Sequence, residues 1–174
     1  MILCCVFLSC ASARVTQNEL AAERRQAEKT FNFEIQVPPA EVLPLFGPVR
    51  ESEWDPAWKP RFLYPAAGSN TRAGAVFTVT HEDGRETVWI LLEYSAERMT
   101  IHYAVVSPEV TAAEIWVRVS PTQRAGARVD VTQRRTSLRP EADELISKFE
   151  RHFQYEASHW QGAIEAYLRR RTTK

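Results

Sequence analysis

The feature that most constrains this chain is a long amphipathic helix predicted at its C-terminal end, opening at Pro140. Acidic residues lie near the start of this segment and basic residues near its end, as the helix dipole favours. Apolar residues recur at spacings of three and four, at Leu145, Ile146, Phe149, Phe153, Ala157, Trp160, Ile164 and Leu168. A helix with one continuous apolar face has to bury it, so the preceding chain must supply a matching surface.

The preceding chain has the pattern of antiparallel strands. Phe31 to Val37 alternates apolar and polar residues, which is the period of a strand with one wet face. Pro39 and Gly47-Pro48 delimit a short apolar helix, and a second short helical piece is predicted over 49–54. Asp83-Gly84 is a strong hairpin signal. Further strands are predicted at 62–64, 74–81, 86–94, 98–106, 110–119 and 127–136.

This order of elements predicts one α+β domain over residues 31–171. The strands form a meander, and the long helix buries its apolar face against the resulting sheet. A chain of 174 residues with 44% hydrophobic and 25% charged residues is globular in composition and long enough to bury one core.

The element order and three short motifs resemble the START-like or SRPBCC superfamily. The motifs are Glu51-Ser52-Glu53-Trp54-Asp55-Pro56-Ala57-Trp58, Gly74-Ala75-Val76-Phe77 and Thr87-Val88-Trp89. They are similar to an uncharacterised bacterial branch labelled polyketide cyclase or dehydrase-like. The resemblance implies a helix-grip fold, in which a strongly curved antiparallel sheet wraps the C-terminal helix around an apolar cavity. Because the superfamily supports many activities on one scaffold, the resemblance predicts fold more closely than function.

Two segments precede the domain. Residues 1–13 have an apolar run closed by Ala11-Ser12-Ala13, which resembles a signal-peptidase site and predicts a mature N-terminus at Arg14. The charged start of such a leader is missing here. We expect an exported protein if the leader is genuine and a cytoplasmic one otherwise. The run is shorter than the roughly 20 residues of a membrane span, and we expect no transmembrane anchor. Residues 14–30 read as a polar helical spacer.

Aromatic residues are the candidates for ligand contact. The helix-grip resemblance implies space between helix and sheet, which suits a small apolar or amphipathic molecule. We expect eight rings to line this space, namely Trp54, Trp58, Tyr64, Phe77, Trp89, Tyr103, Trp116 and Phe153. The competing interpretation is that each ring simply fills the core.

Five residues are weak candidates for acid or base catalysis. Glu51, Glu53 and Asp55 lie near one opening of the expected cavity, where burial would raise the pKa of a carboxyl. Solvated carboxylates around a turn are the alternative. His102 and Tyr103 are adjacent in a strand and must point to opposite faces, and we favour Tyr103 pointing inward.

Several other classes of function have no support in the sequence. Lys plus Arg and Asp plus Glu each total 22, so no net charge draws the chain to nucleic acid. No phosphate loop, nucleophile elbow or dinucleotide fingerprint is present, so we expect no nucleotide cofactor. His152, Glu156 and His159 fall on neighbouring helix directions, but a polar helix flank explains them better than a metal site. All three cysteines lie within the first ten residues, which leaves the domain without thiol chemistry.

Two functional classes remain. One is a protein that binds a small hydrophobic or amphipathic ligand in the interior cavity without chemistry. The other is a cyclase or dehydratase-like enzyme, in which a cavity carboxylate, His or Tyr moves a proton on the bound substrate. The two differ in the polar content of the cavity, because an enzyme needs a base with a shifted pKa facing its substrate.

Overall fold

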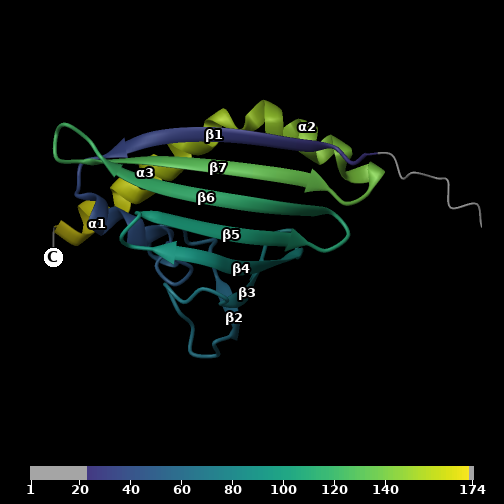
Figure 1. The fold of residues 1–174 in the computed structure, drawn as a ribbon, viewed down its shortest axis with the longest axis horizontal. Helices are drawn as coiled ribbons and strands as arrows, with labels where there is room; N and C mark the ends of the chain where they lie inside the picture. Colours follow the sequence, from purple (N-terminus) through teal and green to yellow (C-terminus); the bar gives the residue numbers. More distant parts are fainter. Residues whose placement is uncertain (1–22, 173–174) are drawn as a thin grey trace, which may run out of the picture.

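The structure, a computed structural model, describes residues 23–172, in which seven strands form one antiparallel sheet (Figure 1). The strands are β1 (Gln26–Ile35), β2 (Pro60–Tyr64), β3 (Val76–Thr80), β4 (Glu86–Ser95), β5 (Thr100–Ser107), β6 (Thr111–Pro121) and β7 (Ala127–Ser137). Their order across the sheet is β1-β7-β6-β5-β4-β3-β2, so the first strand pairs with the last. The predicted antiparallel meander is confirmed for β2 through β7. The predicted leader and its cleavage site before Arg14 lie outside the described residues.

Strand β1 begins earlier than the sequence analysis predicts. Residues 26–30 belong to the strand, so the predicted helical spacer is wrong over that part. The register of β1 on β7 runs from Gln26 opposite Thr136 to Ile35 opposite Ala127. The long β7 strand therefore offers backbone partners to polar residues whose side-chain pattern alone favours a helix.

Short helical segments follow β1, as predicted. They are α1 (Pro39–Val42), η1 (Leu43–Phe46) and η2 (Glu51–Glu53). Gly47 separates the second from the third, and a Cβ at this position would lie 2.1 Å from the side-chain oxygen of Asn70. The Asn70 amide also donates to the carbonyl of Pro44 at 3.1 Å. This close approach fixes the helical segments against the loop between β2 and β3.

The C-terminal helix is divided into η3 (Pro140–Ala142), α2 (Asp143–His152) and α3 (Gln154–Thr172). Phe153 separates α2 from α3 but keeps helical dihedral angles, and its N–H still donates to the carbonyl of Phe149 at 3.0 Å. Most of the predicted apolar face packs on the core, whereas Leu145 is 39% exposed and does not belong to it. None of the helices within residues 23–172 combines membrane-spanning length with sufficient apolar character.

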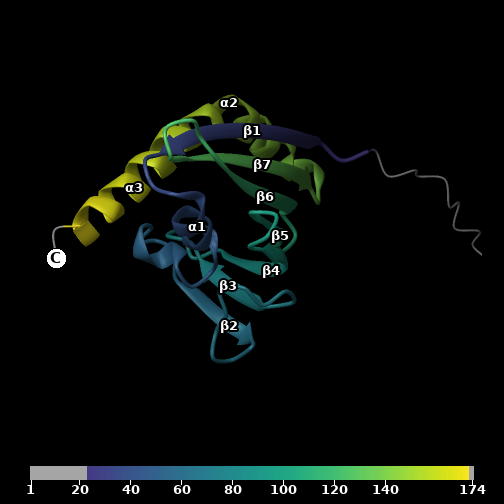
Figure 2. The ribbon, with the colours of Figure 1, turned by 60° about the vertical axis from the view of Figure 1, so that its left-hand side comes forward.

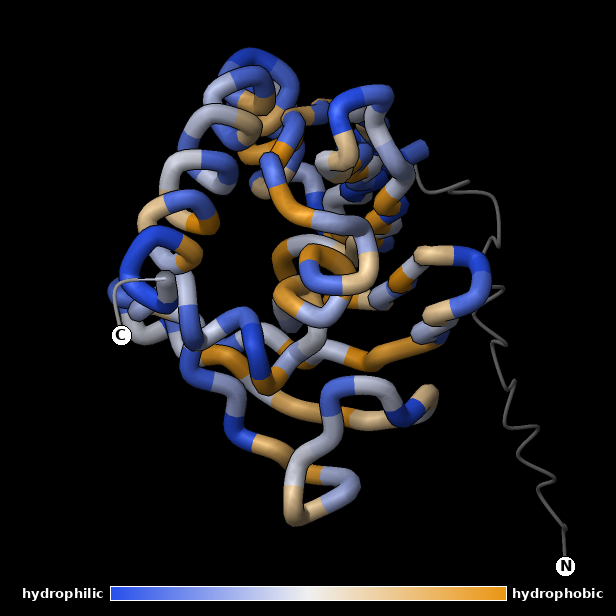
Figure 3. Tube along the Cα trace, turned by 90° about the vertical axis from the view of Figure 1, so that its left-hand side faces the viewer, coloured by the Kyte–Doolittle hydropathy of each residue, from blue (hydrophilic) through white to orange (hydrophobic). Residues whose placement is uncertain are grey.

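The sheet curves around the helices and encloses the core (Figure 2). Register shifts at 62–64 in β2 and 91–93 in β4 mark irregular pairing, which is how strands bend sharply. The end-on view in Figure 3 shows α3 along one side and the strands around the other, with α1 and η1 between them. Helices α2 and α3 contact β1, and α1 and η1 contact β6. The elements therefore confirm the predicted helix-grip architecture.

Candidate functional site

A cavity of about 220 Å³ lies between the inner face of the sheet and the helical elements. Its apolar lining comes from η1, the loop after η2, four strands and α3, and comprises Phe46, Ala57, Trp58, Val79, Trp89, Tyr103, Ile115, Val117 and Trp160. Its polar lining comprises Glu51, Asp55, His81, Gln133, Arg135 and Glu156. An apolar enclosure with a few placed polar groups has the character of a small-molecule site.

Three aromatic rings form one wall of this cavity. Trp58 and Trp89 meet edge to face with ring centroids 4.8 Å apart, and Trp89 meets Tyr103 in the same way at 5.6 Å. The indole N–H of Trp58 donates to the carbonyl of Pro48 at 2.8 Å, and that of Trp89 donates to the hydroxyl of Thr87 at 2.9 Å. Because both indole donors are satisfied within the protein, these two rings offer a ligand apolar surface rather than hydrogen bonds.

The eight predicted ring residues do not lie together. Trp58, Trp89 and Tyr103 line the cavity, while Trp54 and Phe77 are buried in the layers that support it. Trp54 packs on Trp160 with ring centroids 5.8 Å apart, and Phe77 stacks on Trp89 at 6.0 Å. These two rings hold cavity residues in place rather than facing the cavity.

The other three predicted rings lie elsewhere. Phe153 lines a neighbouring cavity beneath α2. Tyr64 is 51% exposed at the end of β2, where Arg72 stacks on its ring. Trp116 stacks on His102 at 4.7 Å on the outer face of the sheet. The expectation that Tyr64 and Trp116 line the cavity is therefore wrong. For Trp116 the reason is strand parity, because its neighbours Ile115 and Val117 point inward.

Glu51 is the buried acid of the cavity. Its side chain projects from η2, the residue is 9% exposed, and no group of residues 23–172 donates a hydrogen bond to its carboxyl. Burial raises the pKa of Glu51 well above its ordinary value, and the nearby charge of Asp55 raises it further. The protonated form of Glu51 thus persists to higher pH than in a solvated glutamate.

The remaining acid–base candidates have other roles. Glu53 is bonded to Arg50 and to Tyr167 outside the cavity, and these bonds lower its pKa. Tyr103 points inward, as predicted, but donates its hydroxyl proton to the carbonyl of Phe46 at 2.8 Å. Burial raises the pKa of Tyr103 well above its ordinary value, so the phenol stays protonated at neutral pH and cannot accept a proton as a phenolate. His102 points outward.

Asp55 lies beside Glu51 at the outer end of the cavity. Its carboxylate accepts a hydrogen bond from the backbone N–H of Ala57 at 2.9 Å, which caps the turn predicted at Asp55-Pro56. Asp55, Ala57 and His81 also line a hollow of about 740 Å³ at the surface. These three residues thus lie between the cavity and the surface hollow, next to the 51–58 segment.

Two inward-facing polar residues of β7 are missing from the predicted site. The inward positions of β7 include Val129 and Val131, and the same alternation brings Gln133 and Arg135 into the cavity. Both nitrogen donors on one edge of the Arg135 guanidinium, Nε and Nη2, bond to the side-chain oxygen of Gln133, at 3.2 and 2.7 Å. The sequence signal for both residues is the alternation along β7, because positions two and four residues after Val131 must point to the same inner face.

Two further cavities adjoin the first. One of about 200 Å³ shares His81, Trp89, Ile115 and Arg135 with it, and one of about 330 Å³ beneath α2 shares Arg135 and Glu156. Arg135 lines all three. The combined space reaches the range of small-molecule pockets, roughly 300 to 1,000 Å³. Within the part of the chain that the structure describes, His152, Glu156 and His159 do not form a cluster able to hold a metal ion.

Comparison with known proteins identifies the fold. No protein-family model matches the chain, and no curated protein matches its sequence. Norcoclaurine synthase from Thalictrum flavum superposes with a TM-score of 0.63 at 10% identity, covering 95% of this chain and 98% of that one. XoxI from Bacillus cereus gives 0.61 at 20% identity over 82% and 96%, and Ara h 8.0201 gives 0.58 at 14% over 83% and 98%. The chain therefore has the helix-grip fold of the START and Bet v1-like proteins.

Proposed function

We propose that this protein binds a small aromatic or amphipathic molecule in its interior cavity. The observation that carries the proposal is the aromatic wall of Trp58, Trp89 and Tyr103, which faces space rather than packed side chains. A core built only for stability fills such space, because empty volume costs free energy. Rings that border a cavity while their polar atoms are satisfied gain by contact with an apolar ligand.

The polar groups of the cavity support a ligand with a defined orientation. Glu51 at one end and Arg135 at another both lack an ion-pair partner among residues 23–172. Buried polar groups are normally satisfied, and ligand atoms are one means of doing so. In a structure with the same fold, norcoclaurine synthase holds dopamine and hydroxybenzaldehyde. That complex supports the proposal only in showing that the fold accommodates small aromatic molecules.

The proposal is tested by native mass spectrometry of the gently purified protein, followed by a screen of fatty acids, sterols and aromatic polyketides. We expect a retained or added small molecule that quenches tryptophan emission, because three tryptophans line the cavity. The absence of any bound species, together with unchanged emission across the screen, would contradict the proposal.

A matched pair of variants on β6 places the binding site. Ala113 faces inward beside Arg135, whereas its neighbour Ala112 lies on the outer face opposite Thr136. Ala113→Phe is expected to fill the adjoining cavity of about 200 Å³, which shares Trp89 and Arg135 with the first, and to weaken quenching. Ala112→Phe adds the same ring to the other face and should leave quenching intact. Equal effects of the two substitutions would place the bound molecule outside the cavity.

Acid–base catalysis on the bound molecule is the second candidate function, of the cyclase or dehydratase kind. It is favoured by one observation, the buried carboxyl of Glu51 with its raised pKa facing the cavity. If a bound compound is recovered with altered mass, Glu51→Gln should retain binding and abolish conversion. Glu53→Gln removes a carboxylate from the same helical turn outside the cavity and should leave conversion unchanged. Conversion that survives Glu51→Gln would exclude this role.

A further inference from the structure

Arg135 is a cationic side chain in the interior without an anionic partner. Arg135 lines all three adjoining cavities, and no ion pair holds its guanidinium within residues 23–172. Its guanidinium lies over the ring of Phe149, with the guanidinium carbon 4.4 Å from the ring centroid. Burial lowers the pKa of Arg135, yet an arginine remains charged in proteins. The fold therefore maintains a positive charge beside the apolar surfaces that line these cavities.

The hydrogen bonds of Arg135 leave one edge of the guanidinium available. Gln133 accepts from Nε and Nη2, which occupies the side edge. The end edge, formed by Nη1 and Nη2, retains N–H donors in the fork geometry that matches a carboxylate bidentately. Gln133 is 2% exposed and acts as a positioning residue that orients this fork.

The row of residues around Arg135 leaves room for a ligand. Across the inner face the register places Ala27 and Ala113 on either side of Arg135, followed by Val105 and Trp89. Two alanines flanking an arginine give it little side-chain cover from the neighbouring strands. The aromatic surface of Trp89 lies in the same row, at the far side of these small residues.

Charged groups of both signs lie around Arg135, and Glu51 and Asp55 line the first cavity together with Glu156. Arg85 from the β3–β4 turn and Lys148 from α2 line the adjoining cavities, and Arg85 is already paired with Asp83 at 2.6 Å. Glu156 of α3 is the acidic group whose charge acts on Arg135, but it forms no ion pair with it. An incoming anion would thus compete with one exposed glutamate.

We propose that Arg135 anchors the carboxylate of an aromatic carboxylic acid whose ring lies against Trp89 and Trp58. This inference rests on the proposed binding function and names the chemical class of its ligand. The carboxylate accepts two parallel hydrogen bonds from the free edge of the guanidinium, and Gln133 holds that edge in place.

The test compares 2-naphthoate with 2-naphthamide, which share a ring system and differ in charge, by isothermal titration calorimetry at about pH 7, where a carboxylic acid is ionised. We expect 2-naphthoate to bind at least about tenfold more tightly, in line with a charge-assisted pair of hydrogen bonds. Arg135→Gln should lower the affinity for 2-naphthoate much more than that for 2-naphthamide and so remove this preference. Arg134→Gln deletes the same charge from the outer face and should preserve the preference.

Two further variants keep the test decisive. Glu156→Gln removes the competing carboxylate and should tighten binding of 2-naphthoate a few-fold, by more than it changes binding of 2-naphthamide. If Arg135→Gln fails to fold, Arg135→Lys keeps the charge but lacks the fork, and it should reduce the preference without abolishing it. Equal affinities of the wild-type protein for both probes would overturn the inference and leave the binding function intact. Failure of both probes to bind, together with a negative ligand screen, would overturn the binding function itself.

Discussion

The two faces of the sheet use adjacent arginines in opposite ways. Arg134 points outward, where it bonds to Glu114, lies 3.8 Å from Glu28 and stacks over Trp116. Arg135 points inward, where it has one amide partner and no carboxylate within the described chain. The outer arginine is satisfied by its neighbours on the same sheet. The inner one keeps donors available, and this difference separates a structural surface from a candidate binding surface.

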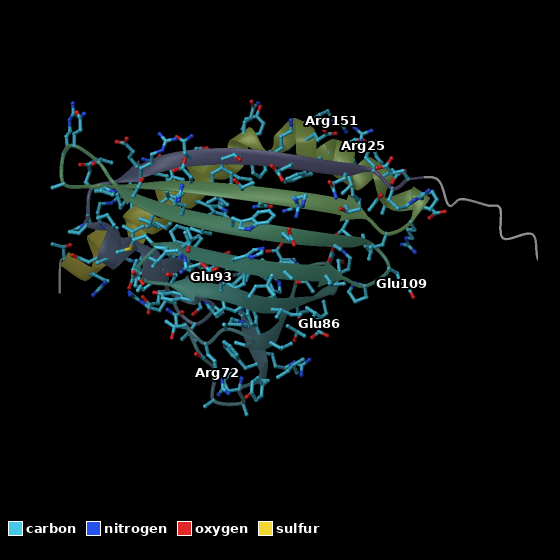
Figure 4. The ribbon with its side chains drawn as sticks, in the orientation of Figure 1. Arg25, Arg72, Glu86, Glu93, Glu109 and Arg151 are labelled. Carbon is cyan, nitrogen blue, oxygen red and sulfur yellow. The ribbon has the colours of Figure 1, made fainter. Side chains whose placement is uncertain are left out.

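The same contrast extends across the sheet. In one outward row His102 stacks on Trp116, and charged side chains such as Glu93 and Glu109 lie around that face in Figure 4. In the neighbouring inward row Tyr103 and Ile115 border the cavity together with Gln133. The outward Trp116 is covered by polar neighbours, whereas the inward Trp89 and Tyr103 border the cavity. Aromatic content alone does not distinguish the two, but strand parity does.

The largest expected difference between the faces is in stability. Phe77 is fully buried beneath Trp58 and Trp89, so Phe77→Ala should lower the free energy of unfolding by about 3 to 5 kcal/mol. Trp116→Ala removes a larger ring from the outer face and should cost about 1 kcal/mol or less. Denaturant unfolding measures both values. Equal losses would mean that the outer face carries as much of the core as the inner one.

Most of the fold is predictable from sequence because its signals are local. The alternation of apolar and polar residues predicts strands, and Asp83-Gly84 predicts a hairpin. Apolar residues spaced by three and four predict the C-terminal helix. The pairing of β1 with β7 has no such signal, because it joins residues about one hundred positions apart. The extension of β1 over residues 26–30 depends on that pairing and was missed for the same reason.

The candidate site was predicted less completely than the fold. Glu51, Trp58 and Trp89 were found because their motif resembles a family with an interior cavity. Arg135 was missed, although the valines at alternate positions before it predict that it points inward. Which inward residue borders space and which is covered depends on packing between distant strands and helices, and a single sequence does not specify that packing.

A smaller expected effect distinguishes the buried Glu51 from solvated carboxylates. Because burial raises the native pKa of Glu51 above its ordinary value of 4.5, the folded protein holds this proton where the unfolded chain has lost it. The contribution of Glu51 to the free energy of unfolding is fully present below pH 4.5 and is lost as pH rises through the native pKa. Glutamine does not ionise, so Glu51→Gln does not show this loss. From pH 4.5 upward, the free energy of unfolding of the variant should exceed that of the wild type by a growing amount.

Glu53→Gln is the matched control for this measurement. Hydrogen bonds from Arg50 and Tyr167 lower the pKa of Glu53, so its contribution is present above pH 4.5 and is lost as pH falls. The two variants should therefore change the pH dependence of stability in opposite directions. Parallel curves for wild type and Glu51→Gln would show that Glu51 is solvated, and the acid–base role would lose its basis.

The smallest expected effect concerns the outer face. His102 stacks on Trp116, and its Nε2 atom is buried without a hydrogen-bond partner among residues 23–172. Desolvation lowers the pKa of His102 below its ordinary 6.5 and outweighs the charges of Glu114 and Glu93, which raise it. The unfolded chain therefore takes up a proton before the native state does, and stability is lost as pH falls below 6.5.

His102→Phe keeps a ring on Trp116 but does not titrate. The free energy of unfolding, measured from about pH 7.5 to 5.5, should therefore depend less on pH in this variant than in the wild type. The difference should be about half a kcal/mol or less, because solvent screens a partly exposed group. This loss on acidification is opposite in direction to that of Glu51, since burial disfavours the charge of either group but the histidine is charged at low pH and the glutamate at high pH. An unchanged slope in His102→Phe would mean that the ring pairs with water as freely as in the unfolded chain, and the outer face would then be more open than its stacked rings indicate.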